Sequence, residues 1–222
     1  MPRRITSETV PIVLRRLRRA ARMRHAPSVS QIAEERRDPF RVLTACILSL
    51  RTKDETTGPA AQRLFALADT PQQLARIPVR TIERAIYPVG FYHTKARTLR
   101  SLSCYLIQKH AGKVPDAIEA LLAIKGVGRK TANLVVTVGF GKPGICVDTH
   151  VHRISNRWGF VRTSTPEETE FALRESLPRR YWIRYNDLLV SFGQTICHPT
   201  SPRCSRCTLA DLCPRIGVRH FR

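Results

Sequence analysis

The spacing of hydrophobic and polar residues predicts a chain built of helices. Asp38 and Pro39 offer a capping side chain and a proline suited to a first helical position, and an apolar run from Phe40 to Leu48 follows. Near the N-terminus, apolar residues recur at helical spacing inside a very basic stretch; they are Val13, Leu14, Leu17, Ala20 and Ala21. Both segments have the periodicity of helices that bury one face.

Three further stretches have the spacing of a helix capping box, a capping residue followed three positions later by Glu or Gln. They start at Thr70, Asp116 and Thr165. The most strand-like run covers residues 134–138, but its alternation is poor, and the sequence has no Asn-Gly or Asp-Gly hairpin turn. We therefore predict an all-α fold.

The charge of the chain predicts a polyanionic partner. Lys and Arg number 38 against 17 Asp and Glu, which gives a formal net charge of +21. Nucleic acid fits this excess, because phosphate neutralisation releases counterions and supplies most non-specific affinity. An anionic membrane surface is the alternative, since the basic stretch 15–24 is amphipathic. Its apolar side is small and lacks aromatic residues, which disfavours membrane binding.

No stretch approaches the roughly 18 apolar residues of a membrane-spanning helix. The first residues are basic but have no apolar signal core. We expect a soluble intracellular protein, cytoplasmic and associated with the nucleoid if its source is prokaryotic.

The seven cysteines are unevenly distributed. Cys46, Cys104 and Cys146 stand alone in apolar surroundings, where a small buried hydrophobic residue is expected. The other four crowd near the C-terminus; they are Cys197, Cys204, Cys207 and Cys213. A disulfide framework would not have this distribution, whereas four thiolates in one short segment indicate a metal centre.

The gaps between these four cysteines favour an iron-sulfur cluster over zinc. Zinc sites usually pair cysteines closely in two knuckles, but here only Cys204 and Cys207 are close, and the outer gaps are wide. A cubane is larger than one ion and suits this wider loop, so we expect a [4Fe-4S] cluster, with zinc as the alternative. A loop braced by metal would present Arg203 and Arg206 to phosphates; the alternative is that both are merely solvated.

A glycine hairpin precedes a pair of cationic residues. Gly126, Val127 and Gly128 lie between two helical patterns, and Arg129 and Lys130 follow directly. Such a turn directs backbone N–H groups outward at the start of the second helix, where they bind phosphate without reading sequence. Gly-x-Gly alone usually marks only a turn, but the basic pair and the cationic chain around it favour a DNA contact.

Downstream, a carboxylate stands in an apolar segment at Asp148, within Val147-Asp-Thr-His150. It either caps a helix that begins near Thr149 or takes part in chemistry.

Together these motifs resemble the endonuclease III family of helix-hairpin-helix DNA glycosylases. The stretch GVGRKTAN at residues 126–133, VDTH at 147–150 and the four-cysteine spacing occur in the family's order, and the similarity runs from about residue 39 to 213. The resemblance implies that Lys130 is the nucleophile and Asp148 its acid-base partner. Related adenine and mismatch glycosylases share the cluster but lack the lysine, so Lys130 indicates a bifunctional glycosylase and AP lyase.

The resemblance also implies an architecture and a DNA partner. A six-helix barrel domain would cover residues 32–142, and an iron-sulfur cluster domain would combine residues 1–31 with 143–222. Double-stranded DNA containing damaged bases or abasic sites would cross the cleft between them, contacted also by His150. We expect a monomer.

Two stretches of this chain resemble family segments that act when a base is flipped out of the duplex. Residues 48–54 resemble the segment that fills the gap left by the flipped nucleotide, where many members have glutamine and this chain has Arg51. Residues 90–96 resemble the loop that inserts an apolar side chain into the base stack, here Phe91. The fork of Arg51 can hydrogen-bond a guanine bidentately, so we expect lesions opposite guanine to be preferred. A phosphate-contacting surface arginine is the alternative.

The expected function is base-excision repair. The enzyme would remove damaged, oxidised pyrimidines through a lysine Schiff base and cleave the abasic site by β-elimination. The alternatives are a glycosylase of the same superfamily for mismatched or alkylated bases, and a non-enzymatic metal-containing DNA-binding protein. The last would have no use for both Lys130 and Asp148.

Overall fold

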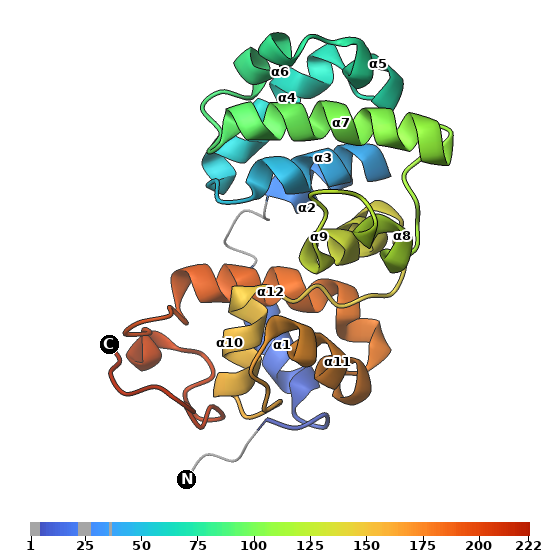
Figure 1. Cartoon of the computed structure of the whole chain (residues 1–222). Coiled ribbons are helices and arrows are strands. Elements are labelled where there is room, and N and C mark those ends of the chain that lie inside the picture. The colour runs from blue at the N-terminus through green and yellow to red at the C-terminus, as the bar shows by residue number, and fades with distance from the viewer. Residues whose placement is uncertain (1–4, 22–27, 36) are drawn as a thin grey trace. The chain divides into compact units, whose positions relative to one another are not determined.

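The computed structural model describes residues 5–21, 28–35 and 37–222. These residues form helices and no strand, which confirms the predicted all-α fold (Figure 1). None of the described helices combines the length and apolarity needed to cross a bilayer. The chain divides into two compact units, residues 27–142 and residues 1–26 with 143–222.

The unit of residues 27–142 is built around α3 and α7. Its helices are α2 (Ser28–Glu35), α3 (Pro39–Ser49), α4 (Asp54–Leu67), α5 (Pro71–Arg76), α6 (Val79–Ile86), α7 (Tyr92–His110), α8 (Ile118–Leu122) and α9 (Arg129–Leu134), and the π-helical turn η1 (Val135–Gly139) continues α9. Figure 1 shows α7 with α5 and α6 along one side and α3 along the other. The central part of α3, from Val42 to Leu48, is fully buried, so this helix forms the middle of the core.

The predicted boundary at residue 32 cuts through a helix. Residues 28–31 begin α2, and α2 packs against α3 and α4 of the same unit. The assignment of barrel and cluster domains stays a prediction.

Two of the predicted helix starts in this unit are confirmed. Asp38 accepts the N–H groups of Phe40 and Arg41 at 2.8 and 3.3 Å, with Pro39 in the first turn of α3. Thr70 caps α5 by accepting the N–H of Gln73. Such a cap stabilises a helix by about 1 kcal/mol.

A helix begins close to Asp116 as predicted, but the predicted capping role of Asp116 is wrong. The helix α8 begins at Ile118, after Ala117, which has no side-chain cap. The Asp116 carboxylate instead accepts a hydrogen bond from Nζ of Lys142 at 2.6 Å, and this pairing lowers the pKa of Asp116. The ion pair offers the carboxylate a cationic partner that a backbone amide does not match.

The second unit contains α1 (Val10–Ala21), α10 (Thr149–Arg157), α11 (Pro166–Ser176), α12 (Trp182–Thr195) and the 3-10 turns η2 (Arg179–Tyr181) and η3 (Cys204–Arg206). In this unit α1 and α10 pack on α12, and α11 packs on α10. Thr165 caps α11 through the N–H of Glu168, which confirms the third predicted start. Trp158 and Tyr185 are buried at its centre, where the Tyr185 hydroxyl bonds Ser155 at 2.9 Å.

The basic helix α1 buries its apolar stripe in this core. Val13, Leu14 and Leu17 are buried, as predicted. The basic stretch extends to residue 24, and residues 22–24 lie outside the described residues. Burial of the stripe leaves α1 without the exposed apolar face that a membrane-surface helix needs.

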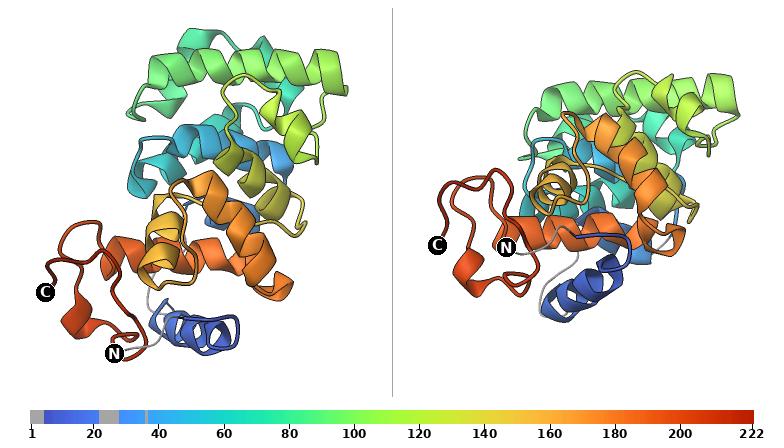
Figure 2. Two further views of the ribbon diagram at one scale, coloured as in Figure 1. Left: turned by 60° about the horizontal axis from the view of Figure 1, so that its bottom comes forward. Right: turned by 90° about the horizontal axis from the view of Figure 1, so that it is seen from below.

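The C-terminal segment, residues 196–222, has only the short turn η3 as regular structure (Figure 2). Backbone hydrogen bonds close it: the N–H of Arg203 donates to Ile196, and that of Arg222 to Pro202. Arg16 of α1 donates to the Thr208 carbonyl and pairs with Asp211 at 2.7 Å. We call residues 196–213 the cysteine loop.

Candidate active site and metal centre

The hairpin between α8 and α9 is a tight turn with free space beside Gly128. Gly126 has a φ of +89°, a conformation that L side chains rarely adopt. Gly128 precedes α9 in extended conformation, and a Cβ placed there would meet no atom within 4 Å. The space in front of Gly128 therefore admits a close backbone approach, as phosphate binding requires.

The expectation of outward-facing N–H groups fails at one hairpin residue, Val127. Its N–H donates to the Ile124 carbonyl at 3.0 Å, and its side chain is only 6% exposed. The apolar side chain of Val127 is drawn into the core together with Ile124 and Leu121. Val127 thus anchors the turn, while Gly126 and Gly128 lie at its surface.

Lys130 lies in the first turn of α9 and is exposed, and Arg129 before it is half-buried. The positive charge of Lys130 interacts electrostatically with the thiol of Cys46 in α3. Burial raises the pKa of Cys46 to about 12, and the positive charge of Lys130 acts against that rise. Cys46 therefore stays a neutral thiol, the small buried residue that the sequence predicts.

Asp148 caps α10. Its Oδ1 accepts the N–H groups of His150 and Val151, both at 2.9 Å, and the residue is 8% exposed. The capping role weighed from the sequence is confirmed, and it fixes the carboxylate at the start of α10. Asp148 and Lys130 belong to different units, and their catalytic roles stay predictions.

His150 is held close to α12 and to the cysteine loop. Nη2 of Arg153 donates to Nδ1 of His150 at 3.1 Å and to the Cys197 carbonyl at 2.8 Å. A Cβ at Gly193 would lie 2.3 Å from Nδ1 of His150, so α12 needs glycine there. The helix that Asp148 caps is thus tied to the first cysteine of the loop.

Arg51 and Phe91 lie side by side on two loops of the unit 27–142. Both have left-handed backbone, with φ of 52° and 60°, which is rare for bulky residues and costs about 1–3 kcal/mol each. The guanidinium carbon of Arg51 lies 5.7 Å from the centre of the Phe91 ring, and Phe91 is 63% exposed. The two predicted insertion residues are therefore neighbours. Strained backbone that presents exposed side chains is typical of functional loops.

Lys95, which is not among the predicted site residues, lies under these loops. The residue is only 6% exposed, and its Nζ donates to the carbonyls of Leu48 and Leu50 at 2.7 and 2.5 Å and to the Thr52 hydroxyl at 3.0 Å. A signal was present in the sequence. Lys95 shares one helical face with Leu99 and other buried residues of α7, and a lysine on an apolar face is an anomaly.

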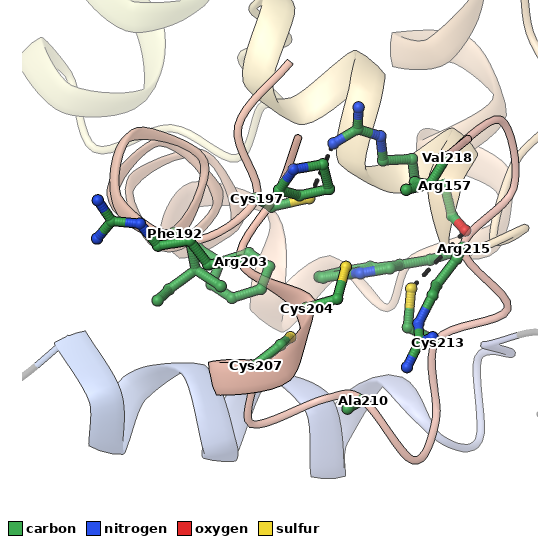
Figure 3. A pocket seen from close by; sticks show the side chains of 13 residues that line it. Arg157, Phe192, Cys197, Arg203, Cys204, Cys207, Ala210, Cys213, Arg215 and Val218 are labelled. Carbon is green, nitrogen blue, oxygen red and sulfur yellow. Dashed lines mark hydrogen bonds between the residues drawn. The ribbon is translucent and has the colours of Figure 1, made fainter. Parts of the chain in front are cut away.

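The four clustered cysteines line one cavity, shown in Figure 3. Apolar side chains such as Trp158, Phe192 and Val218 complete its wall. Two N–H donors reach the sulfur atoms: Nη1 of Arg157 lies 3.3 Å from Sγ of Cys197, and the N–H of Leu209 lies 3.4 Å from Sγ of Cys207. In the part of the chain that the structure describes, no three Cys, His, Asp or Glu residues form a compact metal-binding group.

The surroundings of these thiols disfavour the negatively charged thiolate form. Burial raises the pKa of Cys207 to about 11 and also raises the pKa values of Cys204 and Cys213. The charges of neighbouring cysteines act in the same direction at all three. Thiolates at Cys204, Cys207 and Cys213 would therefore need a nearby cation to compensate their charge.

A buried arginine of α10 holds the cysteine loop. Arg157 of α10 is 9% exposed and also donates to the carbonyls of His198 and Pro199 at 2.6 and 2.5 Å. By contrast, Arg203 and Arg206 at the two ends of η3 are exposed. The cysteine loop is thus held by one buried arginine of α10 and exposes two arginines of its own.

Comparisons with known proteins agree in one family. Residues 44–179 match the model of the HhH-GPD superfamily base excision DNA repair proteins. Endonuclease III of Thermotoga maritima is 49% identical over 176 residues, which make up 79% of this chain and 83% of that protein.

Two solved structures share the fold. An endonuclease III trapped as a covalent intermediate with DNA, in an estranged-adenine complex, has a TM-score of 0.82 and 35% identity, and the match covers 95% of this chain and 97% of that one. A thermostable thymine-DNA glycosylase has a TM-score of 0.71 and 25% identity over 85% and 93% of the two chains. From the family model and the identity to its relatives, the chain belongs to the endonuclease III family of the HhH-GPD base excision DNA repair proteins.

Proposed function

We propose that this base-excision repair enzyme, a DNA glycosylase and AP lyase of the endonuclease III family, attacks oxidised pyrimidine nucleotides in duplex DNA with Lys130. One observation carries the proposal. Lys130 is an exposed amine in the first turn of α9, directly after a hairpin that leaves open space at Gly128. A phosphate at that hairpin would bring the sugar of its nucleotide to the amine.

The damaged nucleotide must first leave the base stack, at a cost of a few kcal/mol that is lower for a damaged pair. We assign the filling of the resulting gap to Arg51 and Phe91. The neutral amine of Lys130 then attacks C1′, the glycosidic bond breaks, and the base departs with the bonding electrons and takes up a proton. Ring opening gives a Schiff base between Lys130 and C1′. Loss of a 2′ proton then breaks the C3′–O bond, and the 3′ phosphate leaves.

Asp148 would serve this sequence in two ways. It accepts the proton that the attacking amine releases, and its negative charge stabilises the positive charge that develops on the sugar as the base departs. Its position is fixed by the two N–H bonds at the start of α10, so little reorganisation is needed during the reaction.

The cationic surface would hold the DNA. We assign phosphate contacts to Gly126, Gly128, Arg129 and His150, and to Arg203 and Arg206 at the ends of η3, while Val127 shapes the turn. A single copy carries every residue of the proposal, so we propose a monomer. The substrate places the enzyme on chromosomal DNA, in the cytoplasm if the source is prokaryotic.

The residues of the cysteine loop fit a [4Fe-4S] cluster. Four thiols line one cavity, two N–H donors reach their sulfur atoms as in iron-sulfur proteins, and apolar side chains shield the space. We propose that Cys197, Cys204, Cys207 and Cys213 hold the cluster, whose ligation supplies folding free energy to the loop. Arg203 and Arg206 would then stand on a rigid support.

Borohydride trapping tests the nucleophile. With a duplex containing an oxidised pyrimidine, we expect the native protein to form a covalent adduct, and Lys130→Gln to bind the duplex but form none. Lys125→Gln is the matched control, because Lys125 is an exposed lysine in the same hairpin. Undiminished trapping by Lys130→Gln would assign the attack to another amine.

A mismatch glycosylase is the second candidate, supported by the similarity to a thymine-DNA glycosylase and by Arg51 in place of glutamine. Excision assays on duplexes with oxidised pyrimidines, G·T mismatches, alkylated bases or bare abasic sites separate the candidates. We expect the oxidised pyrimidines and the abasic sites to react fastest.

A further inference from the structure

A buried lysine organises the loop that carries Arg51. The ammonium of Lys95 has three acceptors, the carbonyls of Leu48 and Leu50 and the hydroxyl of Thr52, and all three lie in one five-residue reversal. The reversal includes the last turn of α3, where helix carbonyls lack partners from the helix itself. A cation at this end also interacts favourably with the helix dipole. Lys95 thus acts as a cap for α3 supplied by another helix.

The same lysine is connected to the loop that carries Phe91. Its backbone N–H donates to the Phe91 carbonyl at 3.0 Å. The N–H of Gly90 donates to the Thr52 hydroxyl at 3.2 Å, the same oxygen that Lys95 binds. A Cβ at Gly90 would lie 2.9 Å from the Arg51 carbonyl oxygen, so the two loops are in close contact.

These contacts place both strained residues around one ammonium group. Arg51 lies between Leu50 and Thr52, which Lys95 binds, and Phe91 lies four residues before Lys95 on the same helical start. An apolar residue at the position of Lys95 would bind none of the three acceptors. The buried ammonium is costly to desolvate, and burial lowers the pKa of Lys95 to about 8.

We propose that Lys95 is a positioning residue for base extrusion, which holds the loops of Arg51 and Phe91 together as one preformed wedge. The inference rests on the proposed function, because it gives these two residues the task of filling the gap in the duplex. Preformation matters because ordering a side chain only on binding costs free energy that a preformed loop does not lose. Lys95 touches neither the substrate nor the reacting atoms and acts through the loops alone.

The test compares a step that needs the wedge with one that does not. In Lys95→Met, we expect single-turnover excision of an oxidised pyrimidine from duplex DNA to fall by about 100-fold, the scale of a 1 Å misplacement. Cleavage of an abasic site in single-stranded DNA requires no extrusion and should stay within about twofold. Lys109→Met removes an exposed lysine from the same helix and should change neither rate.

A spectroscopic readout separates the wedge from the chemistry. A duplex with a tetrahydrofuran abasic analogue opposite 2-aminopurine reports unstacking of the partner base, and nothing in it can be excised. We expect native protein to raise the fluorescence and Lys95→Met to raise it far less at saturating protein. If the Lys130 mechanism fails, this signal remains readable, so the two proposals fail separately.

A milder variant keeps the proposal testable if Lys95→Met folds poorly. Thr52→Val removes the hydroxyl shared by Lys95 and Gly90 and leaves the charge in place, and we expect about a tenfold loss of duplex excision with single-stranded cleavage retained. Equal loss on both substrates, or undiminished fluorescence and duplex excision in both variants, would overturn the positioning role.

Discussion

The two loops that carry Arg51 and Phe91, here called the wedge loops, and the cysteine loop both present exposed arginine side chains, but different forces fix their shape. The wedge loops of Arg51 and Phe91 lie on α3 and α7, whose buried residues belong to a continuous hydrophobic core. The cysteine loop contains one short 3-10 turn and is held by buried Arg157, by backbone closures and by its contact with α1. Packing determines the first region, whereas the second depends on hydrogen bonds and, in our proposal, on metal ligation.

The difference suggests a division of labour. A strained turn such as that of Arg51 persists only where rigid surroundings hold it, which helix packing supplies. A loop that only supports phosphate contacts tolerates a less exact frame, because such contacts position DNA without reading its sequence. Losses in the wedge loops should therefore impair specificity and excision, and losses in the cysteine loop should impair binding and folding.

Removal of a cysteine ligand should change the most properties at once: metal content, loop order and DNA binding. In Cys204→Ser we expect loss of bound iron, faster hydrogen exchange across residues 196–213, and at least about tenfold weaker DNA binding, equal to ~1.4 kcal/mol. The native protein should contain about four irons per chain. Exchange in α3 and α7 should not change.

Cys104→Ser is the matched control, because Cys104 is a lone, half-buried thiol on α7. It should retain the iron and the DNA affinity. Retention of iron in Cys204→Ser, or one zinc and no iron in the native protein, would contradict the cluster assignment.

Asp148 allows charge and capping to be separated. Asn caps helices about as well as Asp, so Asp148→Asn should keep the start of α10 and lose about 10²–10⁴-fold in single-turnover excision. Asp148→Ala removes both functions and should also cost about 1 kcal/mol of stability, measured by urea unfolding. Equal excision by native protein and Asp148→Asn would leave the carboxylate with its cap alone.

Much of the unit of residues 27–142 was predictable because its apolar residues recur at helical spacing. The buried run of α3 and the caps at Asp38 and Thr70 follow local rules that the structure obeys. The failure at Asp116 arose because a residue distant in sequence, Lys142, competes for the carboxylate. A local pattern carries no information on such a partner.

The candidate site was predictable from motifs more than from physical pattern. The hairpin and the capping position of Asp148 could be read from short stretches, and the resemblance to the family supplied their roles. The contribution of Lys95 could not be derived, because its three acceptors come from α3 and the turn after it, more than 40 residues away in sequence. Likewise, no spacing rule joins Arg157 to the sulfur of Cys197.

Substitution of the wedge arginine tests the specificity side of the comparison. In Arg51→Ala we expect slower single-turnover excision and loss of a preference for lesions opposite guanine, because bidentate contacts discriminate between bases by roughly 1–3 kcal/mol. Rates on duplexes with each of the four opposite bases measure it. Equal loss on all four, with unchanged excision at saturation, would assign Arg51 to phosphate contact.

Substitution of Arg206 in the cysteine loop should have the smallest effect, and it should change DNA affinity rather than excision or base preference. Arg206 is exposed at the end of η3, and a phosphate contact there neutralises one charge without touching a base. Arg206→Ala should weaken binding to all duplexes alike, lower the slope of log affinity against log salt by about one, and leave excision at saturation unchanged. Affinity measured at several salt concentrations, for damaged and undamaged duplexes, provides the test. An unchanged slope would show that Arg206 is a solvated surface residue. A loss of affinity confined to damaged duplexes would show that the cysteine loop also takes part in damage recognition, the role that we assign to the wedge loops.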